Sequence, residues 1–466
     1  MKHAFPVLFF ALALPALASA APRTMRLDYF HSGNAREERF SAGRVVVEPL
    51  PWPGNPSRPL DDTNLGKYFF EVRDAATGRP IYSRGFASIY GEWEETDEAK
   101  TADRTFEESV RFPAPDAPVV VVLEKRDAAN RFREIWRTTI DPKSMFVDPS
   151  VPPAPAPLLA LQKSGDPAEK VDFLILGDGY TREEEPKFEK DARRLMEIFF
   201  STSPYKEHRS DFNVWGLCPP SPESGISRPS TGVHRRNPVG STYDAFGSER
   251  YVLTFDNRAF REIAQFAPYE VVEILVNGDT YGGGGIFNLY STVAADSEWA
   301  PYIFVHEFGH HFSGLADEYF TSDVAYDTTG ELVEPWEPNA TAMKDPAQLK
   351  WKDLVSPGTP VPTPWKKEEF ETRSHEIQAK RRAIRAANRP ESEMNALFRA
   401  EREEETKLLG TDRYSGKVGA FEGANYRAKG YYRPQEDCIM FTRDEVGFCA
   451  VCRRALERVI ALYTAR

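Results

Sequence analysis

The sequence predicts a two-domain protein, in which an all-β sandwich precedes an α/β domain that carries a helical insertion. Short β-branched and aromatic runs fill residues 24–148, whereas apolar strands alternate with amphipathic helices across residues 165–466. Between them, the proline-rich residues 149–164 predict a stiff linker. A chain of 466 residues is also too long for one ordinary domain.

The first domain contains seven strand-like runs separated by glycine, proline, asparagine and aspartate. Their spacing is typical of a β-sandwich. The runs are "RLDYF", "GRVVVEPL", "KYFFEVRD", "PIYSRGFASI", "FEESVRF", "VVVVLEK" and "FREIWRTTI".

The second domain alternates between strand and helix signals. Three runs predict buried strands: "KVDFLILGDGYT", "DFNVWGLC" and "YEVVEILVN". Helices are expected at 182–201, at 257–267 and at the C-terminus, and the glycines at 282–285 are interpreted as a turn. Residues 366–408 predict a solvated helical hairpin with one thin apolar seam, broken at 388–390 with Ser392 placed to begin its second helix. A regulatory or substrate-gripping cap is the alternative for this hairpin.

Composition and the N-terminus restrict compartment and partners. Residues 1–20, "MKHAFPVLFFALALPALASA", predict a cleaved signal peptide and therefore a secreted or periplasmic protein. No later run is long enough to span a membrane after signal cleavage. With 59 Lys+Arg against 71 Asp+Glu, the net charge of −12 argues against nucleic acid or an anionic membrane as partner. The sequence leaves the oligomeric state open.

Four cysteines suit an oxidising compartment: Cys218, Cys438, Cys449 and Cys452. The "CAVC" at 449–452 could be a redox pair or half of a zinc knuckle. Because it lacks a second CxxC, the sequence favours disulfides for these residues, without indicating which pairs form.

The stretch "VHEFGHHFSGLADEY" at 305–319 has the spacing of a metal site. His306 and His310 lie one helical turn apart, so both imidazoles can reach one Zn²⁺ ion at about 2.0–2.1 Å. Glu307 is placed to take a proton from a zinc-bound water. Gly314 can end the helix and reverse the chain, and His311 is expected to point away from the metal.

Two routes could complete this site. In one, a glutamate of the helical insertion, Glu371 or Glu376, supplies the third ligand. In the other, the chain turns at Gly314 and Asp317 binds the metal, with Glu318 in reserve, while Met440 of "DCIMFT" lies beneath it in a tight turn. The short step from glycine to acid favours Asp317.

Several separated motifs resemble the IgA-peptidase family of metzincins. They are "HEFGHHFSGLADEY", "GAFEGANYRAKGYYRP" and "CIMFTRDEVGFCAVC", with "EPLPWPG" and "SRGFASIYGEWEETDEA" in the first domain. The resemblance implies a metzincin-like catalytic domain preceded by a β-sandwich, and zinc-dependent endopeptidase activity on protein or peptide substrates. It maps His306 and His310 onto the ligands, Glu307 onto the base and Met440 onto the Met-turn.

The chain departs from the general metzincin pattern in one place. Ser313 stands where that pattern has glycine, and Gly314 follows one residue later, so the loop is one residue longer. Asp317 keeps the three-residue step from glycine to ligand.

The sequence therefore predicts an exported endopeptidase with one catalytic Zn²⁺. The alternatives are a zinc amidase acting on wall peptides and a surface-binding or adhesin protein with a structural metal. Glu307 argues against the last, because a structural metal needs no general base. Two further expectations follow. A chain beginning near Gln162 should still cleave short peptides, because the sandwich is needed only for large substrates. Substrate should lie in extended form along residues 285–292, which are expected to form a strand, with Asn288 and Tyr290 flanking the cleft.

Overall fold

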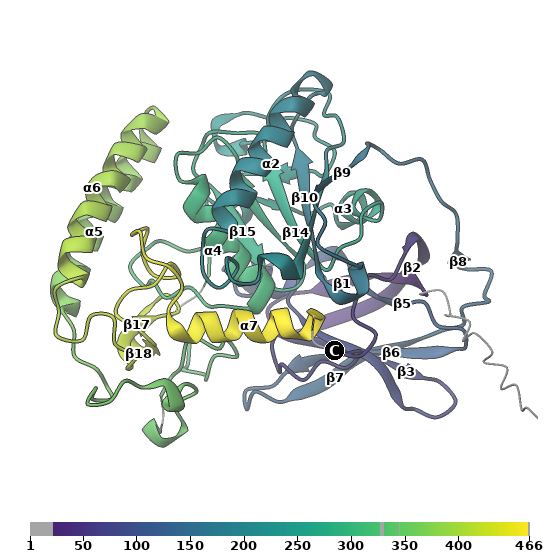
Figure 1. The fold of residues 1–466 in the computed structure, drawn as a ribbon, viewed down its shortest axis with the longest axis horizontal. Coiled ribbons are helices and arrows are strands. Elements are labelled where there is room, and N and C mark those ends of the chain that lie inside the picture. The colour runs from purple at the N-terminus through teal and green to yellow at the C-terminus, as the bar shows by residue number, and fades with distance from the viewer. Residues whose placement is uncertain (1–21, 327–329, 344, 465–466) are drawn as a thin grey trace, which may run out of the picture.

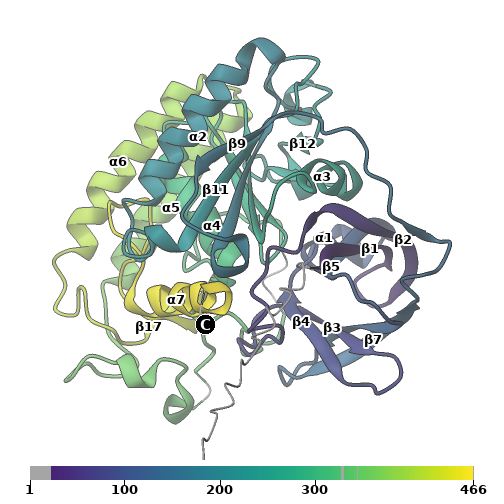
Figure 2. The same cartoon turned by 45° about the vertical axis from the view of Figure 1, so that its right-hand side comes forward.

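The computed structural model describes residues 22–326, 330–343 and 345–464. The predicted signal peptide, residues 1–20, lies outside this range. The described chain is a mixed α/β structure, with the sandwich on one side of the C-terminal domain and the helical insertion on the other (Figures 1 and 2).

All seven runs of the first domain form strands. Together with the short strand β8, they make two four-stranded sheets, in the orders β5-β1-β2-β8 and β4-β3-β6-β7, which enclose a core that includes Leu27, Phe70 and Val121. Only the end of the fourth run differs, because Ile89 begins the short helix α1 (Ile89–Trp93). The strands are β1 (Arg23–Gly33), β2 (Glu38–Pro51), β3 (Tyr68–Asp74), β4 (Pro80–Phe86), β5 (Arg104–Pro113), β6 (Val119–Arg126), β7 (Phe132–Ile140) and β8 (Val147–Asp148).

A six-stranded sheet forms the centre of the second domain, in the order β15-β16-β14-β10-β11-β9. The four inner strands are parallel, and both edge strands run antiparallel to their neighbours. Every residue of β10 is buried, as is usual for a central parallel strand. The strands are β9 (Leu158–Gln162), β10 (Val171–Asp178), β11 (Phe212–Leu217), β14 (Val271–Val276), β15 (Gly283–Ile286) and β16 (Tyr290–Ala294).

Both edge strands depart from the sequence predictions. β9 lies inside the stretch 149–164 that was expected to be linker, because Leu158–Gln162 pairs with β11. The glycines expected to form a turn instead make β15, which pairs with β16 and so becomes the edge of the sheet. Their small size allows this strand to lie against a helix, as described below.

The predicted helices are present. The helix α4 contacts both α2 and α7, and α3 lies on the side of the sheet that faces the sandwich (Figure 1). The helices are α2 (Glu185–Phe199), α3 (Asn257–Ala264), α4 (Ala300–Ser313), α5 (Lys367–Ala386), α6 (Glu391–Leu409) and α7 (Ala450–Thr464), and the remaining strands are β12 (Ser241–Thr242), β13 (Leu253–Thr254), β17 (Phe421–Ala424) and β18 (Arg427–Arg433).

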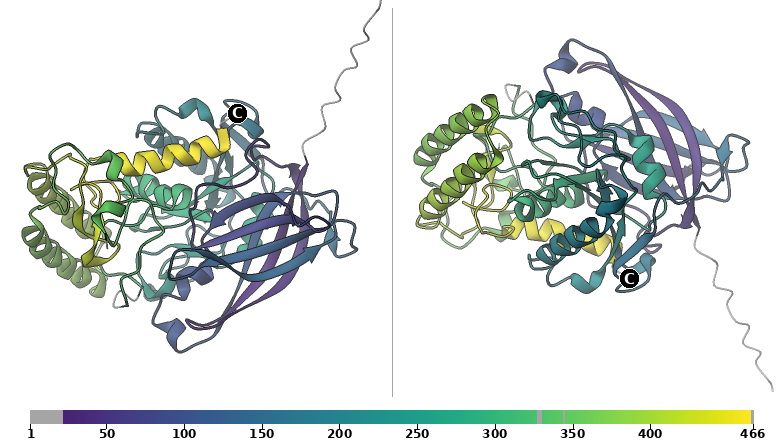
Figure 3. Two further views of the ribbon diagram at one scale, coloured as in Figure 1. Left: turned by 90° about the horizontal axis from the view of Figure 1, so that it is seen from below. Right: turned by 90° about the horizontal axis from the view of Figure 1, so that it is seen from above.

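The insertion is a helical hairpin at the end of the molecule opposite the sandwich (Figure 3). It breaks between α5 and α6 where predicted, but α6 begins at Glu391 after Pro390, so Ser392 does not start it. Phe370 and Ile377 of α5 and Phe398 of α6 are buried, which agrees with the predicted apolar seam. Among the described residues, no helix has the length and apolar character needed to cross a membrane.

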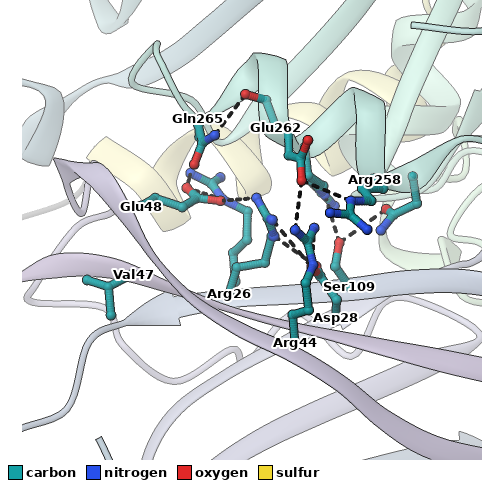
Figure 4. Close-up of polar contacts among 12 residues, drawn as sticks. Arg26, Asp28, Arg44, Val47, Glu48, Ser109, Arg258, Glu262 and Gln265 are labelled. Carbon is teal, nitrogen blue, oxygen red and sulfur yellow. Dashed lines mark hydrogen bonds and ion pairs between the residues drawn. The ribbon is translucent and has the colours of Figure 1, made fainter. Parts of the chain in front are cut away.

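A network of charged side chains joins the sandwich to α3 (Figure 4). The Arg44 guanidinium donates to Asp28 at 3.1 Å within the sandwich and to Glu262 on α3 at 2.7 Å. From the other direction, Arg261 of α3 donates to Ser109 Oγ of β5 at 2.9 Å. Asp28 is almost wholly buried, so its contact with Arg44 lies in a poorly solvated interface rather than on an open surface.

The two domains also share apolar contacts. Leu65, Ala87, Trp93 and Phe106 of the first domain belong to the same continuous core as the sheet of the second. In addition, the Ala87 amide donates to the Phe287 carbonyl at 2.9 Å. The two domains therefore share part of one core, which argues against a sandwich that can be removed without effect on the fold.

We expect a chain that lacks the sandwich to fold poorly. A chain beginning at Pro155 keeps β9 but exposes the apolar surface that Trp93 and Phe106 cover in the intact protein. Thermal unfolding and size-exclusion chromatography should show aggregation or loss of the cooperative transition. A monomeric fragment that unfolds cooperatively and still cleaves a short peptide would restore the original expectation.

A buried acid at the start of β10 makes stability depend on pH. Asp172 Oδ1 accepts from Trp215 Nε1 at 2.7 Å and from Asn213 Nδ2 at 3.0 Å, while Oδ2 has no hydrogen-bond partner in the described part of the chain. Burial raises the pKa of Asp172 to about 7, and burial together with Asp172 raises the pKa of Glu270. An unfolded aspartate has a pKa of about 3.9.

The free energy of unfolding should therefore fall as pH rises from about 4 to 7, because the unfolded Asp172 releases its proton before the folded one does. Asp172→Asn keeps an oxygen acceptor for Trp215 and removes the buried charge. We expect a higher Tm than wild type at pH 8, with little difference at pH 4. The same pH dependence of Tm in both proteins would exclude Asp172 as its source.

Candidate functional site

The helix α4 carries both histidines of the predicted site. It is apolar around most of its circumference, and residues on all its faces are buried, as in a helix enclosed by a domain. Gly314 ends it in the left-handed conformation, with φ 59° and ψ 39°. A Cβ atom at this position would lie only 2.4 Å from the Trp336 ring, so both the conformation and the space require glycine.

Three donor atoms converge beyond this turn. Asp317 Oδ1 lies 3.0 Å from His306 Nε2 and 3.2 Å from His310 Nε2, and the two Nε2 atoms are 3.1 Å apart. A metal about 2.0–2.1 Å from each donor sets tetrahedral ligands about 3.3–3.4 Å apart. The triangle therefore has nearly the size of one face of such a tetrahedron, with its fourth corner left for water or substrate.

The opposite ring nitrogen of each histidine is fixed by the backbone. His306 Nδ1 donates to the Ile439 carbonyl at 2.9 Å, and His310 Nδ1 donates to the Leu315 carbonyl at 2.5 Å. Tyr302 Oη also lies 3.1 Å from His306 Nδ1. With Nδ1 carrying the proton, each Nε2 keeps a lone pair that can bind a metal.

The protonation of the site reflects the proximity of these groups. Burial lowers the pKa of His310, but the nearby Asp317 carboxylate has the larger combined effect and raises this pKa to about 9. Burial alone would raise the pKa of Asp317, but His310 and His306 hold it well below its usual range. A metal ion that binds here would replace a proton on His310.

The loop that carries Asp317 is held by two residues, Tyr426 and Asn339, that were not predicted to belong to the site. Tyr426 Oη donates to Asp317 Oδ2 at 2.6 Å, which orients the carboxylate. Asn339 bonds both the amide and the carbonyl of Ala316, at 2.7 and 2.9 Å. Tyr426 stands in a quoted family motif, whereas no local pattern marks Asn339.

The other candidates for the third ligand lie elsewhere. Glu318 Oε1 points away from the histidines, towards Asn339 Nδ2 at 2.9 Å and Cys452 Sγ at 3.4 Å. On the insertion, Glu371 pairs with Lys367 and Glu376 with Arg373.

Glu307 lies beside the triangle. One of its carboxylate oxygens and one ring nitrogen each of His306 and His310 all lie within 4.8 Å of one another. Burial raises the pKa of the Glu307 carboxyl. The site thus places an acid–base group next to the fourth corner, where a metal-bound water or substrate could react.

The glycines of β15 allow this strand to lie close to α4. A Cβ atom at Gly285 would lie 2.4 Å from the Glu307 carbonyl oxygen, and one at Gly283 would lie 2.6 Å from Ile303 Cγ2. Larger residues would push the edge strand away from the helix that carries the histidines.

Met440, the residue predicted to form a Met-turn, lies close to α4. Its sulfur would lie 3.2 Å from a Cβ atom at Gly309, the residue just before His310. The Met440 carbonyl accepts from the Glu318 amide at 2.8 Å, so the turn is also tied to the Asp317 loop.

His311 supports the fold rather than the triangle. Its Nδ1 donates to the Ile286 carbonyl at 3.1 Å, and its Nε2 accepts from the Val272 amide at 3.0 Å. Burial lowers the pKa of His311 to about 3, so the ring stays neutral. As predicted, it points away from the other two histidines.

A cavity of about 660 Å³ opens over the site. Three parts of the chain line it: Lys67, Glu92 and Lys125 come from the sandwich, His306, Glu307 and Asp317 from the second domain, and Gln378 and Glu405 from the insertion. The Tyr326 hydroxyl donates to Glu92 at 2.9 Å across the two domains. The sandwich and the insertion are therefore parts of the cavity wall.

The prediction that Asn288 and Tyr290 flank the cleft is wrong. The Asn288 side chain donates to the Gly85 carbonyl of the sandwich at 2.9 Å, and Tyr290 is buried with its hydroxyl bonded to the Thr254 carbonyl at 2.7 Å. The segment expected to be one strand is a hairpin that turns between β15 and β16. Of this hairpin, Gly283, Gly285 and Ile286 of β15 line the cavity.

The four cysteines are free thiols in this structure, and all are buried, so the expected disulfides are not formed. Cys218 lies apart, beside Gly177 of β10. The other three lie together with Glu318, all with donor atoms within 4.8 Å of one another.

Comparisons with known proteins agree with this architecture. A family model described as IgA Peptidase M64 matches residues 159–460, and one described as Peptidase M64 N-terminus matches residues 18–137. A search of curated proteins finds no match to this chain. The two matched regions cover most of the chain and correspond to the two domains, so the protein belongs to the IgA peptidase M64 family and is a peptidase.

Proposed function

We propose that this protein is a zinc-dependent endopeptidase with a metzincin-like catalytic domain, in which His306, His310 and Asp317 bind one Zn²⁺. The triangle of donor atoms, 3.0–3.2 Å on a side, carries this proposal. Two imidazole nitrogens and one carboxylate oxygen are donors that Zn²⁺ accepts, and three protein ligands are the number found in catalytic sites. When bound there, the ion would polarise a peptide carbonyl and lower the pKa of a water molecule.

The residues around the triangle suit peptide hydrolysis. Glu307 accepts a proton from the attacking water and later passes it to the leaving amine. Its pKa is higher than that of an exposed glutamate, which suits a group that both accepts and donates a proton. Tyr426 and the Ile439 carbonyl position Asp317 and His306 respectively.

The edge of β15 is the position proposed for an extended substrate. Its outer side is occupied at Gly283, whose amide donates to the Arg250 carbonyl and whose carbonyl accepts from the Val252 amide, both at 3.1 Å. Gly285 and Ile286 follow along the strand, beside Glu307, and both line the cavity. A peptide there could pair with the strand through its main chain while its scissile bond lies over the triangle.

Metal dependence is the first test of this function. The purified protein should cleave casein and a proline-rich hinge peptide, lose this activity after dialysis against a chelator, and regain it when Zn²⁺ is returned. Cleavage unaffected by the chelator would reject the metal mechanism. Hydrolysis of wall peptides alone would favour the amidase, and binding without hydrolysis would favour the adhesin.

We also propose that the protein is exported, on the strength of the apolar run from Phe5 to Leu17 and the "ASA" that follows it. Mature protein recovered from the periplasm or the medium should begin after Ala20. Recovery of the full-length chain from the cytoplasm would contradict export.

A further inference from the structure

A second group of potential metal ligands lies behind the histidine triangle. Glu318, Cys438, Cys449 and Cys452 come from three parts of the chain, are all buried, and have donor atoms within 4.8 Å of one another. Cys438 Sγ lies 3.9 Å from Cys452 Sγ, and Cys452 Sγ lies 3.4 Å from Glu318 Oε1.

These separations suit a tetrahedral metal. Zn–S bonds of about 2.3 Å place two thiolates about 3.8 Å apart, and a shorter Zn–O bond brings a carboxylate oxygen nearer, to about 3.5 Å from sulfur. The observed 3.9 and 3.4 Å agree with both values. Four side chains of these types would complete the coordination of one ion.

Backbone amides are directed at the sulfur atoms. Cys449 immediately precedes α7 and Cys452 lies in its first turn, where the helix dipole favours negative charge. The Cys449 amide donates to Cys438 Sγ at 3.2 Å, and the Cys452 amide donates to Cys449 Sγ at 3.4 Å. Such bonds stabilise thiolates, the form in which cysteine binds a metal.

A disulfide among these cysteines would not explain why the Glu318 carboxylate is buried beside them. Glu318 is fully buried, and its Oε2 has no hydrogen-bond partner among the described residues. A buried carboxylate oxygen without a hydrogen-bond partner is costly. A disulfide would pair two of the three sulfurs and leave the third sulfur and Glu318 as they are, whereas a cation would engage all four. The buried Arg433 guanidinium, which interacts with Glu318 and Cys438, would offset part of the remaining negative charge.

We propose that Glu318, Cys438, Cys449 and Cys452 bind a second metal ion, a thiophilic divalent cation such as Zn²⁺, in a structural site. Its four ligands are all supplied by the protein, so no position stays open for water or substrate, as is usual for structural zinc.

This ion would connect the parts that build the catalytic site. Glu318 directly follows Asp317, and Cys438 directly precedes Ile439, whose carbonyl orients His306. The Glu318 amide donates to the Met440 carbonyl, so the two loops are already joined at one point. Cys449 and Cys452 add the start of α7. Loss of the ion should loosen the Asp317 loop and the Met-turn together.

Metal counting in matched variants tests the proposal. The full chain, purified in buffer free of chelator and oxidant, should contain two metal ions by elemental analysis. His306→Ala with His310→Ala should retain one. Cys449→Ser with Cys452→Ser should lose the second ion and unfold at a lower temperature, while Cys218→Ser, at a buried thiol outside the cluster, should keep both.

Two readouts do not depend on the cysteine variant folding. In the double histidine variant, Co²⁺ should give the strong thiolate-to-metal absorption of a tetrahedral sulfur site. After denaturation in chelator, wild type should show four reactive thiols. The proposal is overturned if the histidine variant holds no metal, if its Co²⁺ complex lacks thiolate absorption, or if only two thiols react because a disulfide has formed. The histidine site and its activity are measured separately by peptide cleavage.

Discussion

Glu307→Gln should reduce kcat by roughly 10²–10⁴, the range expected for the loss of a positioned general base. Glutamine has nearly the same size and can still accept a hydrogen bond, but it cannot take a proton from the attacking water. Glu307 contributes no atom to the triangle of donors, so the metal content of the variant should match that of wild type.

The measurement is the kcat for a short peptide together with the metal content of the same sample. Glu376→Gln, on the exposed part of α5 and paired with Arg373, is the matched control and should cleave like wild type. If Glu307→Gln keeps full activity, another group carries the proton. If it loses its metal, the fall in kcat says nothing about a base.

Asp317→Asn should abolish cleavage by removing a metal ligand. Its Oδ1 contacts both histidine Nε2 atoms, and a neutral amide is a weaker donor than a carboxylate. We expect affinity to fall by more than the ~10–100-fold typical of losing a residue that only positions a ligand. Dialysis against a mild chelator should therefore remove one more metal ion per chain than it does from wild type.

Tyr426→Phe provides the graded comparison. It removes only the hydroxyl that donates to Asp317 Oδ2, so affinity should fall by about 10–100-fold while the fold persists. Glu371→Gln, at the carboxylate considered as a ligand on the insertion, should keep the metal. If Asp317→Asn retains both metal and activity, the third ligand lies elsewhere, with Glu318 the next carboxylate along the chain.

The elements with a strong periodic signal could be predicted from sequence. The seven sandwich strands, β10, β11 and β14, and the helices that carry the histidines and the insertion all follow from apolar spacing and turn residues. The histidine pair, Glu307, Gly314 and Asp317 lie within one short stretch, so local geometry was sufficient to propose how they meet.

What the sequence did not indicate depends on contacts between distant residues. β15 is made largely of glycine, which has no strand signal of its own, and its position follows from the space beside α4. Tyr426 reaches Asp317 across 109 residues, and Tyr326 reaches Glu92 across 234. No local pattern encodes such pairs, so the cavity wall and the continuous core between the domains became visible only in three dimensions.

Disulfides were expected from compartment and cysteine count alone. The structure instead brings three thiols around the carboxylate of Glu318, a residue more than a hundred positions away in sequence. The adjacent residues Asp317 and Glu318 point in different directions, Asp317 to His306 and Glu318 to Cys452, so one short loop contacts both groups.

Anomalous diffraction from crystals of the purified protein can show whether His306, His310 and Asp317 hold a zinc ion. Data collected above and below the zinc absorption edge should give a difference peak about 2.0–2.1 Å from His306 Nε2, His310 Nε2 and Asp317 Oδ1. The peak should vanish below the edge, and it should be missing in Asp317→Asn crystals. Full activity in protein whose crystals show no anomalous density near these three atoms would exclude a catalytic zinc ion at this position.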